Sequence, residues 1–258
     1  MAGAYPAGVQ ELVGRWVVSL RMGDIDAERL KVRSMLSLSA SGDALYAYYA
    51  FYHDPGRTEL HVHEDAKGRV DGFVAVCQTG QRLFQPTVVL RTPDVDVAAD
   101  LLHEALEPGR PYYLITTPDL EDAVSSVVVM SQPHTSRVYE IDLSRFEHTV
   151  NVLVVAEEGI EGRPRFLVRA RDEVVAEAAL GWKSPDFAGI NVQVTASARP
   201  RGFGQAVLSA CTRWAVRSGL HPLVIVEVGD EYTTHLVESV GYVDSGAREL
   251  AADVTCCR

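Results

Sequence analysis

The sequence predicts an α/β fold, and three observations lead to that prediction. Strand-like and helix-like segments alternate, and each half shows the same succession of hairpin, strand, helix, strand, helix and strand. The composition, 47% hydrophobic and 23% charged, is ordinary for a globular protein. The length of 258 residues permits one large domain or two of average size. We therefore expect two diverged copies of one unit, with mixed, mostly antiparallel sheets flanked by helices. One large mixed sheet without an internal repeat is the alternative.

In the first half, apolar residues at helical spacing predict a helix over Val9–Leu20. Asp24 or Asp26 is placed to cap a second helix that runs to about Ser39. The aromatic-rich stretch Ala44–Tyr52 fits helix and strand equally well. The remaining predicted elements are strands 59–63 and 70–79 joined by a turn at Lys67-Gly68, a strand 87–90, a helix 94–106, a strand 112–116, a short helix from Asp119, and β structure over 126–130 and 137–143.

The second half repeats this series from Val150. Its predicted elements are a strand 150–156, strands 165–171 and 174–182 turning at Asp172-Glu173, a strand 191–196, a helix 204–217, a strand 223–228, a helix 231–240 and a last strand 242–250. One face of the helix 204–217 carries Ala206, Val207, Ala210, Cys211 and Trp214. Cys77 and Cys211 lie in apolar patterns and are interpreted as core residues. Cys256-Cys257, at the chain end, is expected to be frayed.

A basic, glycine-rich loop joins the strand 191–196 to the helix 204–217, and it reads Ala198-Arg-Pro-Arg-Gly-Phe-Gly204. Glycines let backbone N–H groups approach an oxyanion, and the helix N-terminus adds the positive end of its dipole. Arg199 and Arg201 add positive charge in a chain of formal net charge −11. The loop lacks the Gly-Lys-Ser/Thr ending of a Walker A loop. It is therefore predicted to bind an anion; a plain strand-to-helix turn with two solvated arginines is the alternative.

This stretch resembles the GNAT acetyltransferases, which carry Gln/Arg-x-x-Gly-x-Gly/Ala between a strand and a helix. The three specified positions are matched by Arg199, Gly202 and Gly204. In the family a strand and a helix follow, and the helix ends in a Gly-Phe/Tyr pair. Here Leu223–Val228 is followed by Asp230 and by a helix that ends at Gly241-Tyr242. The resemblance covers about residues 165–242. It implies tandem GNAT-like folds, with acetyl-CoA as the co-substrate of an N-acetyltransferase.

The resemblance also implies where acetyl-CoA binds. Backbone groups at the end of the strand would pair with the pantetheine arm like an extra strand, and N–H groups at the start of the helix would hold the pyrophosphate. Asp230 stands where the family often has Asn, near the pantetheine. The implied binding residues are Val194, Thr195, Ala196, Arg199, Arg201, Gly202, Phe203, Gly204, Gln205, Ala206, Val207 and Asp230.

The family's usual general acid is missing from its place. That acid is frequently a Tyr four residues before the Gly of the Gly-Phe/Tyr pair, and this position is Val237, which cannot protonate a thiolate. Tyr232 or His235, on neighbouring turns of the same helix, is a substitute. In the alternative interpretation, Tyr232 packs and His235 faces solvent. Many family members release the thiolate without a dedicated acid.

The usual general base is missing as well. In the family it is often an acidic residue on the strand before the loop, but Asn191–Thr195 has no carboxylate. The acids nearest in the sequence are Glu177, Asp186 and Glu227. Glu227 interrupts an apolar strand, where partial burial would raise its pKa and let it accept a proton. A polar residue on the less buried face of a strand end is the alternative.

The equivalent loop of the first half, Leu90–Asp96, has no glycine and places two carboxylates where a pyrophosphate would lie. We therefore predict that residues 1–145 form a degenerate GNAT-like domain that does not bind CoA. Residues 146–258 are predicted to form the GNAT domain with the acetyl-CoA site. The expected function is N-acetyl transfer by direct attack of an amine on acetyl-CoA. An acyl-CoA-binding sensor or scaffold with little or no turnover is the alternative.

Charge and composition exclude several other partners. An acidic chain repels phosphate backbones and anionic membranes, so neither nucleic acid nor membrane is expected as a partner. The chain start resembles no signal peptide, and the cysteines form no disulfide or zinc pattern, which fits a cytoplasmic protein. His61 and His63 share a strand face but lack a third ligand, so no metal is predicted. The expected acceptor is a small-molecule or peptide amine of unspecified identity, and a homodimer stays open.

Overall fold

The computed structural model describes residues 25–80, 82, 84–159 and 162–256. By its internal contacts the chain divides into two compact units. The first unit contains the described residues up to Leu36, the stretch Tyr49–Pro133 and the chain end from Ala252. The second unit contains Ser37–Tyr48 and His134–Ala251. The helix predicted over residues 9–20 lies outside the described part of the chain.

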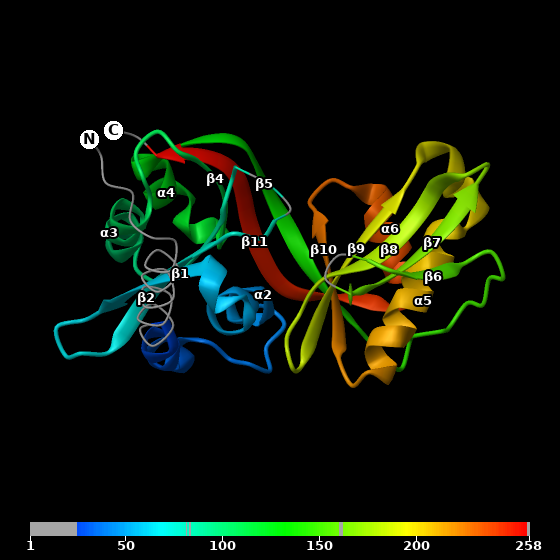
Figure 1. The fold of residues 1–258 in the computed structure, drawn as a ribbon, viewed down its shortest axis with the longest axis horizontal. Coiled ribbons are helices and arrows are strands. Elements are labelled where there is room, and N and C mark those ends of the chain that lie inside the picture. Colours follow the sequence, from blue (N-terminus) through cyan, green and yellow to red (C-terminus); the bar gives the residue numbers. More distant parts are fainter. Residues whose placement is uncertain (1–24, 81, 83, 160–161, 257–258) are drawn as a thin grey trace, which may run out of the picture. The chain divides into compact units, whose positions relative to one another are not determined.

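The first unit has a sheet in which β1, β2, β3 and β4 are neighbours in that order (Figure 1). Its elements are β1 (Thr58–Glu64), β2 (Val70–Cys77), β3 (Thr87–Arg91), α3 (Val95–Ala105), β4 (Pro111–Thr116) and α4 (Glu121–Val127). β1 pairs with β2, and β2 with β3, in antiparallel fashion, whereas β3 and β4 are parallel. The core lies between the strands and the apolar faces of α3 and α4, where Leu101, Leu102 and Val124 are buried.

The second unit has the strand order β10-β9-β8-β7-β6 (Figure 1). Its elements are α2 (Ala44–Ala47), β6 (Val155–Glu158), β7 (Pro164–Ala170), β8 (Glu173–Lys183), β9 (Phe187–Val194), α5 (Phe203–Arg217), β10 (His221–Glu227) and α6 (Glu231–Val240). β6, β7, β8 and β9 pair in antiparallel fashion, and β9 runs parallel to β10. The predicted apolar face of α5 packs on this sheet: Ala206, Val207 and Cys211 are buried, and Ala210 and Trp214 are half-buried.

The predicted repeat is confirmed by the connectivity of the two units. Each has an antiparallel hairpin, a strand, a helix, a strand parallel to the previous one, a helix and a last long strand. The last strands are β5 (Val128–Ile141) after α4 and β11 (Tyr242–Cys256) after α6. Parallel neighbours need a crossover connection, and α3 and α5 supply it. The sequence pattern therefore reports a real structural duplication.

The two long strands explain where the chain divides. β5 has its first part in the first unit and its second part in the second unit, and β11 runs the opposite way. From Ser136 to Glu140, β5 pairs with β10 in antiparallel register. Because β10 belongs to the second unit, the part of β5 that pairs with it belongs there as well, and the division falls after Pro133. The sequence pattern suggested a division after residue 145. The pattern had split β5 into segments 126–130 and 137–143, so its continuity was missed.

Several predicted boundaries are wrong, and each has a local reason. The helix predicted to run to Ser39 ends at residue 32 and tightens into a 3₁₀ turn, Arg33–Met35. The serine- and glycine-rich stretch that follows favours turns over helix. The ambiguous 44–52 stretch is helical, with α2 continuing as a π-helical turn. The β7–β8 turn is centred on Arg171 and Asp172, both in the left-handed region, one residue earlier than predicted.

Three strands also differ in extent from the prediction. Only the last two residues of the predicted strand 150–156 are in β6, which begins at Val155. β9 begins at Phe187, four residues before the predicted start, and ends at Val194. β11 extends past Leu250 to Cys256, so Cys256 is buried in a strand and is not frayed. Cys77 and Cys211 are buried, as predicted.

Candidate functional site

The second unit has an opening between its two parallel strands. β9 and β10 pair only over Phe187–Gly189 and His221–Leu223. Both strands continue beyond this point, β9 to Val194 and β10 to Glu227. Along these extensions β9 still pairs with β8, and β10 still pairs with β5, on their outer sides. The facing backbone edges of β9 and β10 are therefore left without a strand partner, and an extended ligand can pair with them.

A cleft of about 250 Å³ occupies this opening. Its walls are Ile190, Asn191, Val192 and Gln193 from β9, Val224, Ile225, Val226 and Glu227 from β10, and Asp230 and Thr233 beyond β10. Side chains alternate between the two faces of a strand. Ile190 and Val226 turn toward the core under α5 and α6, whereas Asn191, Gln193 and Glu227 are exposed. The cleft thus has an apolar side and a polar side.

The predicted anion loop lies at the end of β9. Thr195 is followed by a 3₁₀ turn, Ala196–Arg201, and Gly202 then leads into α5. No side chain caps α5 at its N-terminus. The first N–H groups of a helix have no partner within the helix, and the dipole places positive charge there. The start of α5 can therefore accept an anionic group from outside.

The two glycines of the motif have different structural roles. Gly202 has φ of +69°, a left-handed conformation that favours glycine. Gly204 makes room for neighbouring side chains. A Cβ at Gly204 would lie 2.9 Å from the Tyr232 hydroxyl oxygen and 2.9 Å from Cγ2 of Val194. The start of α5 therefore lies against both the end of β9 and the first turns of α6.

The two arginines of the motif are exposed, and each lies over an aromatic ring. The Arg199 guanidinium is 4.3 Å from the centre of the Tyr232 ring, and that of Arg201 is 4.9 Å from the centre of the Phe203 ring. A cation over an aromatic face is attracted by the ring quadrupole. These contacts hold both positive charges beside the start of α5. The two arginines are therefore more ordered than freely solvated side chains.

Asp230 caps α6 with the carboxylate that lines the cleft. It accepts hydrogen bonds from the backbone N–H of Thr233 at 3.0 Å and from its hydroxyl at 2.6 Å. Burial alone would raise the pKa of Asp230, but the bonds from Thr233 and the nearby Arg199 charge outweigh it, and its pKa is lowered. Asp230 is therefore ionised at neutral pH. Thr233 was missed from the sequence; it stands three residues after Asp230, where a backbone N–H commonly donates to the capping side chain.

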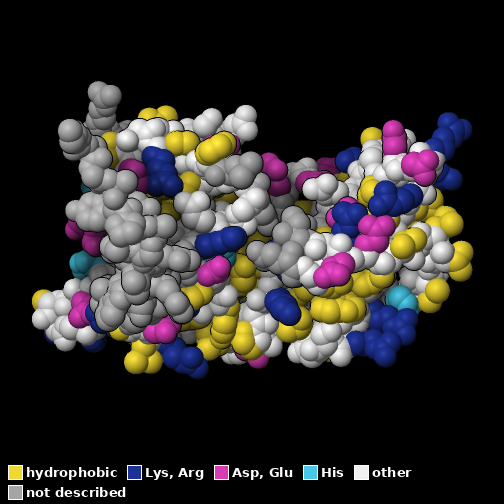
Figure 2. All heavy atoms as spheres, in the orientation of Figure 1, with side chains coloured by type: hydrophobic (Ala, Val, Ile, Leu, Met, Phe, Trp, Pro, Cys, Tyr) yellow, Lys and Arg dark blue, Asp and Glu magenta, His cyan; other side chains and the backbone are white. Residues whose placement is uncertain are grey.

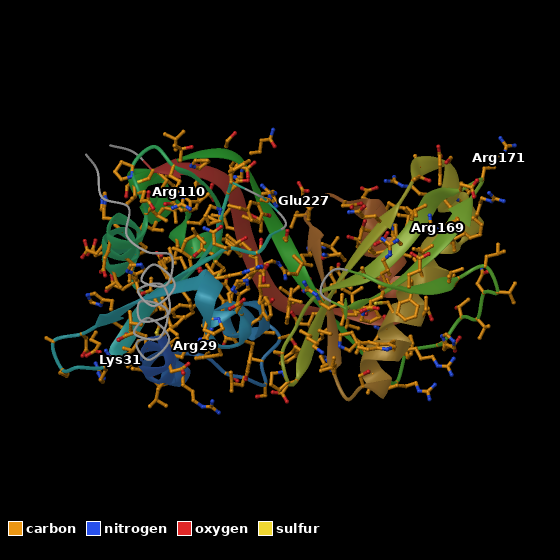
Figure 3. All side chains as sticks on the ribbon, in the orientation of Figure 1. Arg29, Lys31, Arg110, Arg169, Arg171 and Glu227 are labelled. Carbon is orange, nitrogen blue, oxygen red and sulfur yellow. The ribbon has the colours of Figure 1, made fainter. Side chains whose placement is uncertain are left out.

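The three catalytic candidates lie in different surroundings. Glu227 lines the cleft at the end of β10, where Figure 3 labels it. The Glu227 side chain is exposed, so the expectation of a partly buried carboxylate is wrong. The alternative is correct: Glu227 lies on the less buried face at the end of a strand. Tyr232 is half-buried between Gly204 and Arg199, and burial raises its pKa while Arg199 opposes the rise. His235 is exposed on α6. Neither Tyr232 nor His235 is among the residues that line the cleft.

The position of the family's general acid is occupied by a core residue. Val237 is fully buried between α6 and the sheet. A second carboxylate of the unit was missed from the sequence. Glu249 on β11 is 5% exposed, and burial raises its pKa to about 7. Its place in an apolar strand, Leu250-Ala-Ala, gave no signal beyond a charged residue in a hydrophobic run.

The corresponding place in the first unit is closed. β3 and β4 also form three parallel pairs, but at the next position the Thr116 hydroxyl donates to the Leu90 carbonyl oxygen at 3.1 Å. β4 ends at Thr116, so the strands have no extended arms. The α3 N-terminus is capped by Asp94, which accepts from the N–H groups of Asp96 and Val97. This carboxylate fills the position that an anion would take.

The pair His61 and His63 forms no metal site with its neighbours. His61 contacts Glu104 at 3.1 Å, whereas His63 contacts Asp71 at 2.6 Å. Within the described residues, no cluster of three or more His, Cys, Asp or Glu side chains is arranged to hold a metal ion. In the same part of the chain, we find no helix with the length and apolar character needed to span a membrane.

Comparison with known proteins gives matches at the level of structure. No protein-family model and no curated protein matches the chain. A Drosophila protein of known structure is 14% identical, with a TM-score of 0.65 over 91% of this chain and 96% of that one. A tandem GNAT protein from the clavulanic acid biosynthesis pathway is 11% identical, with a TM-score of 0.53 over 92% and 95%. A protein from Novosphingobium aromaticivorans, described as a GNAT-family acetyltransferase, is 12% identical, with a TM-score of 0.55 over 72% and 89%.

Proposed function

Because the chain has the tandem GNAT fold, we propose that its second unit binds acetyl-CoA and transfers the acetyl group to an amine. One observation supports this above all others. The splayed edges of β9 and β10 and the uncapped start of α5 lie at the same end of the same β–α–β unit. An extended arm with an anionic group needs both features in that order. Fold alone does not fix function, so the proposal depends on this site.

Each part of acetyl-CoA has a place in this proposal. The pyrophosphate accepts hydrogen bonds from the N–H groups at the start of α5, beside the charges of Arg199 and Arg201. The pantetheine arm enters the cleft and pairs with the open edge of β9 near Val194. Asp230 and Thr233 lie on the β10 side of the same cleft. The acetyl group then lies in the cleft between its apolar side, with Ile190 and Val226, and its polar side, with Asn191, Gln193 and Glu227.

The chemistry is direct attack of the amine nitrogen on the thioester carbonyl carbon. A tetrahedral intermediate forms, and a backbone N–H of β9 stabilises its oxyanion. The C–S bond then breaks, the amide forms, and CoA leaves as thiolate. The amine must lose a proton to react, and the Glu227 carboxylate at the cleft is the group placed to accept it. We propose no protein acid for the thiolate, because Val237 is apolar and buried. The acceptor is a small-molecule or peptide amine.

A binding protein without turnover is the second candidate. It is favoured by the exposed position of Glu227 and by the absence of a carboxylate on β9. The two candidates share the acetyl-CoA site and differ in whether the bound thioester is then cleaved. Release of free thiol from acetyl-CoA, measured across a panel of small amines and peptide N-termini, separates them. Amine-dependent thiol release supports the transferase, and tight binding with no release by any amine supports the sensor.

Binding itself is tested by calorimetric titration with acetyl-CoA, comparing the wild type with Gln205→Glu. Position 205 is in the first turn of α5, where a carboxylate suits the helix dipole but repels a pyrophosphate. Repulsion near a protein surface is on the order of 1–4 kcal/mol. The affinity is therefore expected to fall at least about tenfold. Thermal stability should change little, because the favourable helix dipole offsets the loss of the long, exposed hydrogen bond from the Gln205 amide to the Ser239 carbonyl oxygen.

A matched control is Gln78→Glu, the same change at an exposed position of the first unit, and it should bind as the wild type does. One molecule of acetyl-CoA per chain is expected, because the first unit has Asp94 at its helix N-terminus and Thr116 across its strands. Equal affinity of the wild type and Gln205→Glu would refute the proposed pyrophosphate site. Absence of binding to the wild type would refute both candidate functions.

A further inference from the structure

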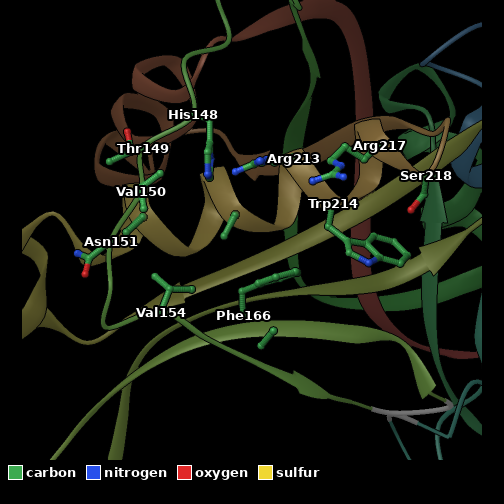
Figure 4. Close-up of a pocket in the computed structure, with 13 residues that line it drawn as sticks. His148, Thr149, Val150, Asn151, Val154, Phe166, Arg213, Trp214, Arg217 and Ser218 are labelled. Carbon is green, nitrogen blue, oxygen red and sulfur yellow. The ribbon is translucent and has the colours of Figure 1, made fainter.

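The second unit has another cavity, which lies beside α5. Its volume is about 460 Å³, and Figure 4 shows its walls. The segment before β6 supplies His148 and Val154, β7 supplies Phe166, and α5 supplies Arg213, Trp214 and Arg217. None of its lining residues also lines the cleft between β9 and β10. Its size falls within the range of small-molecule sites, and it is separate from the proposed acetyl-CoA site.

The charge of this cavity is unusual for the chain. Arg213 and Arg217 are four residues apart, so they lie on one side of α5. No carboxylate lines the cavity. In the described part of the chain, neither arginine has an ion pair or a hydrogen bond through its side chain, although the net charge is −11. In Figure 2, Lys and Arg side chains gather beside a histidine where Figure 1 draws α5, next to hydrophobic side chains.

The C-terminal end of α5 favours one of these charges without any ligand. Carbonyl groups of the last turn attract a cation, and Arg217 is in that turn. Arg213 is a full turn earlier and has no such partner. The dipole therefore accounts for Arg217 alone. Both side chains are exposed, and two unpaired guanidinium groups beside one cavity give it a positive potential that favours an anion.

The remaining walls are apolar. Val154, Phe166 and Trp214 pack partly against the core of the unit and face the cavity with the rest of their surface. Val150 on the same segment also lines the cavity and is 76% exposed. An exposed apolar side chain at the rim of an apolar cavity is typical of a binding site. A purely inorganic anion would leave this surface unused.

The segment that forms one wall is attached to α5. The backbone N–H of Thr149 donates to the Ser209 hydroxyl oxygen at 3.0 Å, and Nδ1 of His148 lies 3.2 Å from the same oxygen. Ser209 is fully buried. Burial, with a smaller effect from Arg213, lowers the pKa of His148, so this ring is neutral at pH 7. The positive charge of the cavity at neutral pH therefore comes from the two arginines.

We propose that this cavity binds a small amphipathic anion. Its apolar body packs against Trp214 and Phe166, and its carboxylate or phosphate group lies between Arg213 and Arg217. Phosphate and carboxylate share this recognition chemistry, since a guanidinium group can donate two parallel hydrogen bonds to either. The site does not depend on acetyl-CoA binding in the other cleft.

The test uses two fluorescent probes of similar shape, anilinonaphthalene sulfonate, which is an anion, and N-phenylnaphthylamine, which has the same rings without the charge. The full chain is titrated with each. The variant Arg213→Gln/Arg217→Gln is expected to weaken binding of the anionic probe about tenfold and to leave the neutral probe within about twofold. Ala210→Leu, which adds bulk to the cavity wall, should weaken both probes.

The matched control is Arg171→Gln/Lys183→Gln, which removes the same charge from exposed positions of the same unit outside the cavity. It should bind both probes as the wild type does. Saturating acetyl-CoA should not displace the anionic probe. The proposal is overturned if the probe does not bind, if acetyl-CoA displaces it, or if the arginine variant binds it as tightly as the wild type or no more weakly than the control.

Discussion

Glu249 makes the stability of this protein depend on pH in a direction opposite to that of most carboxylates. It is the one acidic side chain that is buried among the residues the structure describes, and in that part of the chain it has no ion pair or hydrogen bond. Burial raises its pKa from the ordinary value of 4.5 to about 7. We predict that Glu249→Gln removes this pH dependence and stabilises the protein in mild alkali.

The sign and size follow from linkage between protonation and folding. A folded-state pKa above the unfolded value means that the folded chain holds the proton more tightly. The stabilisation is complete below about pH 4.5 and is lost as the pH rises through about 7. At about 1.4 kcal/mol per pKa unit, the difference between 4.5 and 7 corresponds to about 3 kcal/mol. Glutamine cannot ionise, so the variant should gain up to that amount over the wild type at about pH 8 and little at about pH 5.

The assay is urea unfolding at several pH values between about 5 and 8, which gives the free energy of unfolding of both proteins at each pH. Glu238→Gln, the same change at an exposed position of α6, is the control and should keep the wild-type profile. A constant difference between the wild type and Glu249→Gln at all pH values would refute the reasoning. It would mean that Glu249 has an ordinary pKa or that its carboxylate reaches water.

Two further predictions concern the candidate site. Gly204→Ala places a Cβ 2.9 Å from the Tyr232 hydroxyl oxygen, so overpacking of about 1–3 kcal/mol should outweigh the helix-propensity gain of about 1 kcal/mol. The melting temperature should therefore fall, and adding Tyr232→Phe should restore part of it; no recovery would contradict the proposed contact. Glu227→Gln should lower the rate of thiol release about a hundredfold or more and leave acetyl-CoA affinity nearly unchanged. An unchanged rate would remove Glu227 from the mechanism.

The β–α–β part of the second unit was predicted because its helix and strand follow from patterns of neighbouring residues. The helical spacing of Val207, Cys211 and Trp214 and the apolar run at Leu223 need no tertiary information. Longer strands were cut short where their residues are poor strand formers. The predicted segments 126–130 and 137–143 left out the part of β5 that contains Ser131-Gln-Pro133, and the predicted strand 242–250 left out Ala251-Ala-Asp253 of β11. Pairing with neighbouring strands overrides weak propensity at such places.

The candidate site was only partly predictable for a similar reason. The anion loop is continuous in the sequence, so its glycines and arginines were found. The cleft exists because pairing between β9 and β10 stops after Gly189, and no residue pattern reports that. Gly204 contacts Tyr232 on another helix, and the second cavity forms where the segment of His148 lies beside Arg213 of α5. These are contacts between segments far apart in the chain.

The two units share one architecture and differ at the few residues on which the proposed acetyl-CoA site depends. In each unit two parallel strands, joined by a crossover helix, pair at three residue positions. The units differ at the fourth position, where the next pair of residues would form. In the second unit that position is Val224, whose side chain cannot bridge to β9, and the helix begins at an uncapped glycine. In the first unit it is Thr116, which bonds across to β3, and the helix begins at Asp94. A hydroxyl and a carboxylate thus fill from within the two places that a ligand would take. If the proposed function holds, the residues at the strand–helix junction decide which of the two units binds acetyl-CoA.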